Sequence, residues 1–280
     1  MKKIGFIDYF LDEWHANNYP EWIRRENQAL GLSYELSFAW AERNHPDPNG
    51  LTTSKWCEKF GVQECAEIAE LCEKSDVVVI LAPSNPEKHL EYAQKVFPYG
   101  KRVYIDKTFA PDTATAEQIY SLAKKYGVEF FSTSALRYAA ELEPFAGKSK
   151  AILTTGGGSN LEEYIIHQAE MVVKALGTGA CAVRTEAQAN QYVIRVRYSD
   201  GRRATMLYAN ELPFAIAPVA DAGAYFPVTS DYFQTLIRKI LLFFENGDVD
   251  FEAEQTMEVM RIREAIVRAK ANGKEDWVAL

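Results

Sequence analysis

The first half of the chain alternates short apolar runs with longer segments in which apolar residues recur at helical spacing. Residues 75–110 show this most clearly, because an apolar run at 77–81 is followed by an amphipathic segment at about 87–97 and a second apolar run at 102–105. Unbroken apolar runs are typical of strands buried on both faces of a parallel sheet, and a helix between two of them makes a β-α-β unit. The pattern therefore predicts an α/β domain built on a parallel sheet.

The same alternation extends from the N-terminus to about residue 135. The other predicted strands are 4–7, 34–40 and 128–134, and the other predicted helices begin near residues 20, 54, 65 and 114. Pro20 lies near the first turn of its helix, and Gly31 and Gly127 stand where two of these helices should end. Each predicted boundary thus carries residues that suit it.

Grouped strands replace this alternation in the second half of the chain. Four segments there alternate apolar and polar residues, as expected of an antiparallel sheet with one covered face: 151–155, 181–189, 192–198 and 203–209. The Ser-Asp-Gly-Arg sequence at 199–202 predicts a hairpin turn, and two amphipathic helices at about 230–244 and 253–271 close the chain. We therefore expect an α/β domain at 1–135 and an α+β domain with a mostly antiparallel sheet at 136–280.

Composition and charge exclude some kinds of binding partner. The 280 residues include 31 Lys and Arg against 39 Asp and Glu, and the net charge of −8 argues against a nucleic-acid or anionic-membrane surface. The spacing of the cysteines fits neither a metal site nor a disulfide scaffold: Cys57, Cys65, Cys72 and Cys181. The N-terminal apolar run stops at Asp8, too early for a signal peptide, and no run approaches the ~20 residues of a membrane helix. We expect reduced thiols and a cytoplasmic protein.

The turn after the first strand carries a degraded phosphate-binding motif. Gly5 takes the place of the first glycine of a G-x-G-x-x-G turn, but the second and third glycine positions hold Ile7 and Phe10. The second glycine normally lets the backbone approach a pyrophosphate, and the third allows close packing of helix on strand. Asp8 and Asp12 add negative charge beside any bound phosphate. Dinucleotide binding is therefore disfavoured unless a longer loop over 8–19 leaves room.

Polar residues gather at the carboxyl ends of the predicted strands, the edge where open α/β sheets bind ligands. The strand at 102–105 ends on Asp106 and Lys107. His15, Asn17 and Asn18 precede the first helix, where they either face a ligand or cap and solvate the loop.

A second candidate centre lies on a predicted helix between the three glycines at 156–158 and Gly177. Glu163, His167 and Glu170 fall at i, i+4 and i+7, so they share one side of that helix. A histidine between carboxylates suits proton transfer to or from a hydroxyl, although an ordinary surface ion pair has the same spacing. One helix alone is poor evidence for a metal site, and we expect no metal.

Taken in order, these features resemble the glucose-fructose oxidoreductase, inositol dehydrogenase and MocA (Gfo/Idh/MocA) family. A strand ending near Pro83 is followed by Asn85-x-x-x-His89, a helix, and a strand that ends in an acid-Lys-x tripeptide. In place of the family's Glu-Lys-Pro, this chain has Asp-Lys-Thr from residue 106.

The resemblance continues into the second half. The family has an acid-x-x-x-His-x-x-Asp pattern where this chain has Glu163, His167 and Glu170. An Arg-aromatic pair, which is frequent in the family at the domain crossover, is matched by Arg137 and Tyr138, and the end of the chain resembles the family's C-terminus. Arg137 then orients an anionic or polyhydroxy substrate or forms an interdomain ion pair. The resemblance implies a Rossmann-like dinucleotide-binding domain followed by a substrate and oligomerisation domain.

The activity implied by the resemblance is an NAD(P)-dependent oxidoreductase that transfers hydride between nicotinamide and a sugar, cyclitol or related polyol. His167 is then the acid/base, Lys107 positions substrate and nicotinamide, and Glu163 orients His167. The residues expected along the dinucleotide are Gly5, Ile7, Phe10, Glu42, Pro83, Asn85, His89 and Asp106. The residues expected at the substrate are Lys107, Arg137, His167 and Glu170. NAD is favoured over NADP, because no basic residue is clearly placed for a 2′-phosphate.

Two alternatives to simple dehydrogenation stay open. In one, transient oxidation drives elimination or glycoside cleavage. In the other, the chain is a non-catalytic relative, a sugar-binding, regulatory or partner subunit that has lost the phosphate-binding glycine loop. The degraded turn favours this relative, whereas Lys107 and His167 favour an enzyme.

The second-domain sheet also predicts a homo-oligomer. Its apolar side must be covered, either by another copy or by helices of the same chain. The residues on that side are Ile194, Val196, Met206 and Tyr208.

Overall fold

The computed structural model describes residues 1–219, 224–273 and 276–280. The chain forms two compact units. Unit 1 contains Met1–Ser132 and Leu236–Asp250, and unit 2 contains Thr133–Thr235 and Phe251–Leu280. The expected second domain, 136–280, therefore includes one segment that folds with unit 1.

Unit 1 is built on a six-stranded sheet in the order β3-β2-β1-β4-β5-β6, in which every pair of neighbours is parallel. Its strands are β1 (Lys2–Asp8), β2 (Tyr34–Ala41), β3 (Gln63–Glu64), β4 (Val77–Ile80), β5 (Arg102–Ile105) and β6 (Phe130–Phe131). All four residues of β4 are buried, as its unbroken apolar run predicts. The predicted Rossmann-like parallel sheet is confirmed.

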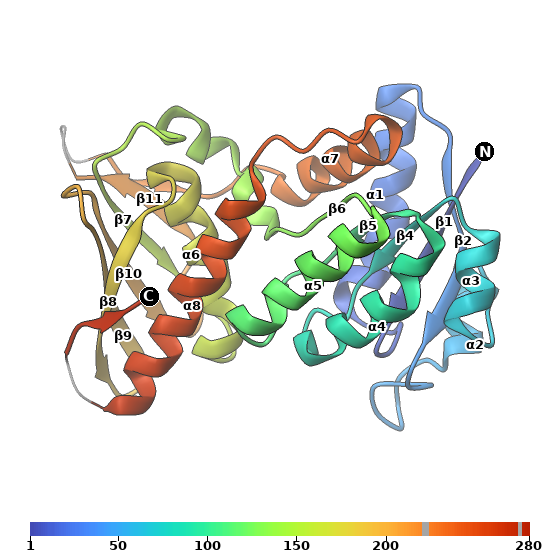
Figure 1. Ribbon diagram of the computed structural model, residues 1–280, viewed down its shortest axis with the longest axis horizontal. Coiled ribbons are helices and arrows are strands. Elements are labelled where there is room, and N and C mark those ends of the chain that lie inside the picture. The colour runs from blue at the N-terminus through green and yellow to red at the C-terminus, as the bar shows by residue number, and fades with distance from the viewer. Residues whose placement is uncertain (220–223, 274–275) are drawn as a thin grey trace. The chain divides into compact units, whose positions relative to one another are not determined.

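Helices cover both faces of this sheet. They are α1 (Trp14–Leu30), α2 (Thr53–Phe60), α3 (Ile68–Lys74), α4 (His89–Val96) and α5 (Thr113–Tyr126). Figure 1 shows α3, α4 and α5 side by side in front of the sheet and α1 behind it, and α4 contacts both α3 and α5. Helix α5 illustrates how the sequence sets its ends, because Asp112 caps its first turn and Gly127 ends it in the left-handed conformation, with φ of 66°.

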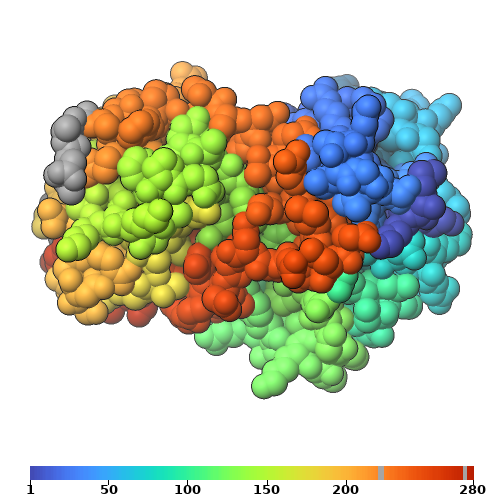
Figure 2. Space-filling view, turned by 90° about the horizontal axis from the view of Figure 1, so that it is seen from above, coloured from blue at the N-terminus to red at the C-terminus, as the bar shows by residue number. Residues whose placement is uncertain are grey.

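The remaining helix of unit 1 comes from far along the chain. Helix α7 (Tyr232–Asn246) lies beside α1 in Figures 1 and 2, where it is orange and α1 is blue. Arg238 Nε donates to Glu26 Oε2 at 2.6 Å, and the Phe243 ring lies 5.0 Å from that of Phe131. These contacts explain why residues 236–250 belong to unit 1, which helical periodicity alone does not reveal.

Unit 2 contains a seven-stranded sheet in the order β12-β11-β7-β10-β9-β8-β13. Its strands are β7 (Ala151–Gly156), β8 (Ala180–Gln188), β9 (Gln191–Tyr198), β10 (Arg203–Ala209), β11 (Ala215–Pro218), β12 (Phe226–Pro227) and β13 (Val278–Ala279). The β7–β10 pair is parallel and the other pairs are antiparallel. The mostly antiparallel sheet predicted for the second half is confirmed.

Two helices of the same unit pack on this sheet, α6 (Leu161–Leu176) and α8 (Ala253–Asn272). The four apolar residues that suggested an oligomer interface are at most 2% exposed in the single chain: Ile194, Val196, Met206 and Tyr208. Helices of the same chain thus cover this face of the sheet. The homo-oligomer stays a prediction, but this face no longer supports it. Helix α8 ends at Gly273. The chain has Ala-Asn-Gly-Lys at 271–274, which is part of its resemblance to the family's C-terminus, and Lys274 lies outside the described residues.

No helix within the described ranges has the length and apolar composition that a membrane crossing requires.

Candidate active site

The carboxyl edge of the unit 1 sheet carries an unusual acid at the end of β1. Asp8 is 1% exposed, and its Oδ1 accepts hydrogen bonds from the amides of Tyr9, at 2.7 Å, and Ala82, at 3.0 Å. Its Oδ2 is buried without a hydrogen-bond partner. Burial, and next the charge of Glu13, raise the pKa of Asp8 well above its ordinary value, although the two amides act in the opposite direction.

The structure corrects the predicted place of Gly5. This residue lies inside β1, in register with Phe38 of β2 and Val78 of β4, and is not in the turn. A Cβ added to Gly5 would meet Ser75 Oγ at 2.5 Å and would collide with the Leu71 side chain. The absence of a side chain at Gly5 therefore allows α3 to pack closely against the sheet. The strand continues for three more residues, to Asp8. The sequence alone did not show this, because an apolar run does not reveal where the following turn begins.

The turn itself starts after Asp8. Ile7 is fully buried in the strand, so it too lies outside the turn. Counted from Asp8, the glycine spacing falls on Phe10 and Glu13. This turn thus has a carboxylate at two of the three glycine positions and an aromatic ring at the third.

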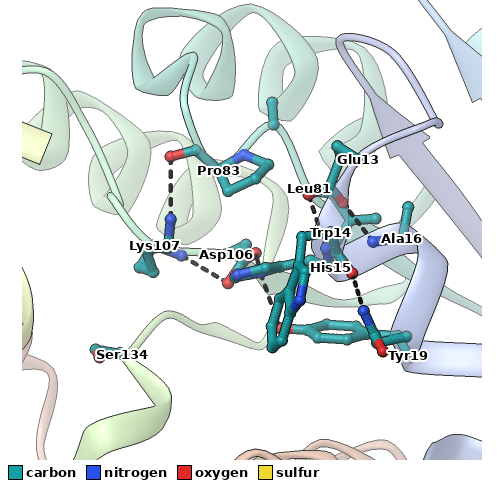
Figure 3. A network of polar contacts seen from close by, with 12 residues as sticks. Glu13, Trp14, His15, Ala16, Tyr19, Leu81, Pro83, Asp106, Lys107 and Ser134 are labelled. Carbon is teal, nitrogen blue, oxygen red and sulfur yellow. Dashed lines mark hydrogen bonds and ion pairs between the residues drawn. The ribbon is translucent and has the colours of Figure 1, made fainter. Parts of the chain in front are cut away.

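Glu13 occupies the N-terminus of α1. Its carboxylate accepts hydrogen bonds from the His15 amide, at 2.8 Å, and from the Ala16 amide, and Figure 3 shows both residues beneath it. Burial raises the pKa of Glu13, against the charge of His15 and the two amides, which lower it. A helix N-terminus attracts anions, and here the anion comes from the chain itself.

A buried histidine and aspartate lie next to this turn. Nδ1–H of His15 donates to the carboxylate of Asp106, which follows β5 and also accepts from Tyr104 OH, at 3.2 Å. The His15 ring stacks on that of Tyr19, with 5.4 Å between centroids. Burial raises the pKa of Asp106, but the charge and hydrogen bond of His15 and the charge of Lys107 outweigh it, so that this pKa is lowered.

Lys107 completes the group at this edge (Figure 3). It is 8% exposed, its amide donates to Asp106 Oδ1 at 2.9 Å, and its Nζ lies 3.5 Å from the carbonyl oxygen of Pro83. Three of the predicted site residues of the first half therefore lie together, at the ends of β4 and β5.

Two other predicted cofactor residues have partners of their own near α4. His89 is fully buried, with its ring nitrogens 2.9 Å from the Phe109 carbonyl oxygen and 2.6 Å from that of Leu81. Burial lowers the pKa of His89, against the effect of these two oxygens. The side chain of Asn85 donates through Nδ2 to Glu87 Oε1 at 3.0 Å. His89 thus connects the start of α4 to the segments that follow β4 and β5.

Glu42 directly follows β2, as predicted for a ribose-binding acid. Its carboxylate accepts from Lys88 Nζ at 2.6 Å and from Tyr92 OH at 2.8 Å. Arg43 and Lys88 lie 5.2 and 5.9 Å from the ring of Tyr9. Two basic side chains, those of Arg43 and Lys88, therefore lie beside the end of β2, although neither was singled out by its position in the sequence.

In unit 2, His167 lies on α6, and its ring centroid is 5.8 Å from that of Tyr164 and 5.6 Å from that of Phe214. Its Nδ1 lies 2.7 Å from Ser134 Oγ, which also accepts from the Leu136 amide at 3.3 Å. Ser134 therefore fixes the orientation of the imidazole ring.

The two glutamates that flank His167 in sequence differ in environment. Glu163 is half-buried and accepts from the Asn160 side chain at 3.1 Å. Glu170 forms a buried ion pair with Arg137, whose Nη1 also donates to Gln255 Oε1 at 2.8 Å. Arg137 and Glu170 are 2% and 3% exposed, and both belong to unit 2, so this ion pair lies within one unit and is not the interdomain pair considered for Arg137.

Sequence reasoning did not single out Glu13 or Ser134. Glutamate is not among the favoured N-cap residues, so Glu13 carries no recognisable capping signal. Ser134 ends a predicted strand, and its partner His167 lies 33 residues further along the chain. Among the described residues, no group of three or more His, Cys, Asp or Glu side chains is arranged to hold a metal.

Comparison with known proteins agrees with this fold. Residues 45–134 match the model of the "Oxidoreductase family, NAD-binding Rossmann fold". A 63-residue segment is 30% identical to "Uncharacterized oxidoreductase YhhX" of Escherichia coli (strain K12), and this match spans 22% of the chain and 18% of that relative.

Solved structures resemble the whole chain. A "probable dehydrogenase" from Thermotoga maritima has a TM-score of 0.80 at 13% identity, over 99% of this chain and 98% of that one. The myo-inositol dehydrogenase from Lactobacillus casei, in complex with NAD(H) and myo-inositol, has a TM-score of 0.79 at 10% identity, over 100% of this chain and 96% of that one. The resemblance to the Gfo/Idh/MocA oxidoreductase family that the motifs predict is thus confirmed by the family model on residues 45–134, and the solved structures show that the fold is shared over the whole chain.

Proposed function

We propose that the chain is a nicotinamide-dependent oxidoreductase that transfers hydride between NAD or NADP and a hydroxyl-bearing carbon of a sugar, cyclitol or related polyol. The observation that carries this proposal is Lys107, which holds the place of the family's lysine inside the matched segment. Its ammonium group lies at the carboxyl edge of the sheet, 3.5 Å from the Pro83 carbonyl oxygen. Ligands of open α/β sheets bind at this edge.

The residues at this edge fit a dinucleotide in the following way. Glu42, after β2, is the acid for ribose hydroxyls, and the loop from Pro83 to Asn85 follows β4 next to the acid and lysine of β5. The amides of His15 and Ala16 converge on one carboxylate, which stands in for a phosphate oxygen. A bound nicotinamide would supply the hydride acceptor.

Lys107 would act on the substrate oxygen. An ammonium group placed against the reacting hydroxyl stabilises the alkoxide character that develops as hydride leaves the carbon. Burial strengthens this effect, because the charge is poorly screened by water. The contact with Pro83 and the bond from the Lys107 amide to Asp106 hold this side chain in place.

His167 would take the hydroxyl proton. Ser134 holds the Nδ1 side of the ring, so Nε2 is the nitrogen that would exchange a proton with the substrate. Glu163, four residues earlier on α6, lies on the same side of the helix and would favour the protonated imidazole that forms.

A second candidate function is a relative that binds a sugar without a dinucleotide. The observation that favours it is the turn after β1, where Glu13 occupies the two amides and no glycine remains between Asp8 and Glu13. The family lysine and histidine support the enzyme instead.

The test is a fluorescence titration of the purified chain with NADH and NADPH, followed by a screen of cyclitols and sugars for reduction of NAD and NADP. We expect Lys107→Met and His167→Asn to abolish turnover. The matched controls, Lys124→Met and His45→Asn, alter exposed residues and should leave it intact. Absence of NADH and NADPH binding at millimolar concentration would exclude the oxidoreductase and favour the second candidate.

A further inference from the structure

The N-terminus of α1 is capped by a residue that is unusual in this role. Short side chains such as Ser, Thr, Asp and Asn are preferred there, because they reach the first amides without strain. Glu13 instead folds its longer side chain back onto the amides of His15 and Ala16. Both of these hydrogen bonds come from the backbone, so the side chain can rotate away without breaking a side-chain hydrogen bond, although it would leave the charge of His15.

These two amides lie at the point where a Rossmann fold holds phosphate. In the order β3-β2-β1-β4-β5-β6, the chain leaves β1 toward β2 on one side, while β4 lies on the other side. The crevice of such a sheet opens at this change of direction, and the pyrophosphate takes the N-terminus of the helix that follows β1. The Glu13 carboxylate and a phosphate oxygen therefore need the same two donors.

A second, independent observation concerns Asp8. Its Oδ2 is buried and has no hydrogen-bond partner, although the residue lies at the first position of the turn that ends at Glu13. Asp8 and Glu13 stand at the first and third glycine positions of the same turn, and the charge of Glu13 raises the pKa of Asp8, next after burial. While Glu13 stays on the amides, a phosphate entering the turn would meet both acids.

The neighbouring acid is held in a different way. Asp12 accepts from the Asn17 side chain at 2.9 Å and from the Leu51 amide at 2.7 Å, so it is fixed to α1 and to the loop before α2. Glu13 is therefore the acid of this turn whose movement would free the His15 and Ala16 amides and would also take a carboxylate away from the phosphate position.

We propose that Glu13 is a built-in competitor of the dinucleotide pyrophosphate: it occupies the phosphate position at the α1 N-terminus, and a dinucleotide binds only after this side chain has left the two amides. The inference rests on the proposed function, since it assumes that this edge takes a dinucleotide. It makes residue 13 a determinant of cofactor affinity.

Calorimetric titration with ADP-ribose tests the proposal, because this probe contains the pyrophosphate but has no nicotinamide and undergoes no hydride transfer. The proteins are the full chain, Glu13→Gln, which keeps the shape and removes the charge, and Glu13→Ser, which supplies a short preferred cap. Glu21→Gln is the control, because Glu21 lies on the same helix and pairs with Arg24 and Arg25 at the surface. We expect both Glu13 variants to bind ADP-ribose at least tenfold more tightly than the wild type, and the control to be unchanged.

The outcomes separate this inference from the proposed function. Equal or weaker binding by both folded Glu13 variants overturns the inference, and the proposed function stands if the wild type binds. Binding by the variants but not by the wild type supports the inference and overturns the nicotinamide-dependent function. If no protein binds at millimolar ADP-ribose, both are overturned.

Discussion

The imidazole of His15, in the first turn of α1, donates to the carboxylate of Asp106, which directly follows β5. This hydrogen bond spans the end of β4, since β4 lies between β1 and β5 in the sheet. It therefore joins the turn after β1 to the segment that carries Lys107. Both side chains are almost completely buried, so the pair is poorly screened by water.

Removal of Asp106 should leave His15 buried without its acceptor. We expect Asp106→Ala to lower the free energy of unfolding by about 3–5 kcal/mol, which is typical when one partner of a buried ion pair is lost. The measurement is urea denaturation at pH 7. Asp112→Ala is the control, because this residue caps α5 at the surface and its loss should cost only ~1 kcal/mol. Equal losses in the two variants would contradict the role given to the pair.

Asp8 should make the protein less stable as pH rises. Its pKa is raised in the folded protein, so the native state retains a proton that the unfolded chain releases near its ordinary pKa of ~4. Folding stability is therefore lost as pH increases above that value, toward the folded pKa. Asn at this position can still accept from the Tyr9 and Ala82 amides and cannot ionise.

We accordingly expect Asp8→Asn to be more stable than the wild type at pH 8, by about 1–3 kcal/mol, and the difference to shrink toward pH 4. Chemical denaturation at pH 4, 6 and 8 measures it. Asp248→Asn, which changes an exposed aspartate of the same unit, should show no such trend. A difference that is independent of pH would contradict the buried-acid explanation.

The parallel sheet could be predicted from the sequence because its central strands β4 and β5 are buried on both faces. The predicted strand at 102–105 coincides with β5, and the run at 77–81 exceeds β4 by one residue. Burial on both faces requires an unbroken apolar run, which is a strong local signal. Helix α7 was also predicted as an element, but its neighbour was not, because an apolar face does not specify what it packs against.

Less of the candidate site than of the sheet could be predicted from the sequence, because several of its contacts join residues that are distant in the chain. Lys107 was placed correctly at a strand end, whereas the glycine turn was assigned three residues too early. Gly5 has the residue type of a turn but lies inside a strand, and only the packing of Leu71 explains it. Glu13 was missed because glutamate is not a favoured N-cap residue, and Ser134 was missed because its partner His167 lies 33 residues further along the chain.

Ser134 should control the tautomer of His167. Its hydroxyl accepts from the Leu136 amide, and a neutral imidazole with an unprotonated Nδ1 can accept the hydroxyl proton in turn. We expect ¹⁵N NMR of labelled histidine to show one dominant tautomer of His167 in the wild type and a mixture in Ser134→Ala. Ser159→Ala, at an exposed position before α6, is the control. The same His167 spectrum in all three proteins would exclude this role of Ser134.

Gly5 should be required for packing and not for ligand binding. A Cβ at this position would collide with Leu71 of α3 and lie 2.5 Å from Ser75 Oγ, so Gly5→Ala should cost about 1–3 kcal/mol of stability through overpacking. Leu71→Ala should itself be destabilising, by ~2–5 kcal/mol, because it opens a cavity under α3. The double variant places the new methyl group in the space that Leu71 leaves, so its loss of stability should be smaller than the sum of the two single losses.

Urea denaturation of the wild type, the two single variants and the double variant gives this coupling energy. Strictly additive losses would show that Gly5 does not contact Leu71, and they would reopen the assignment of Gly5 to a ligand-binding turn.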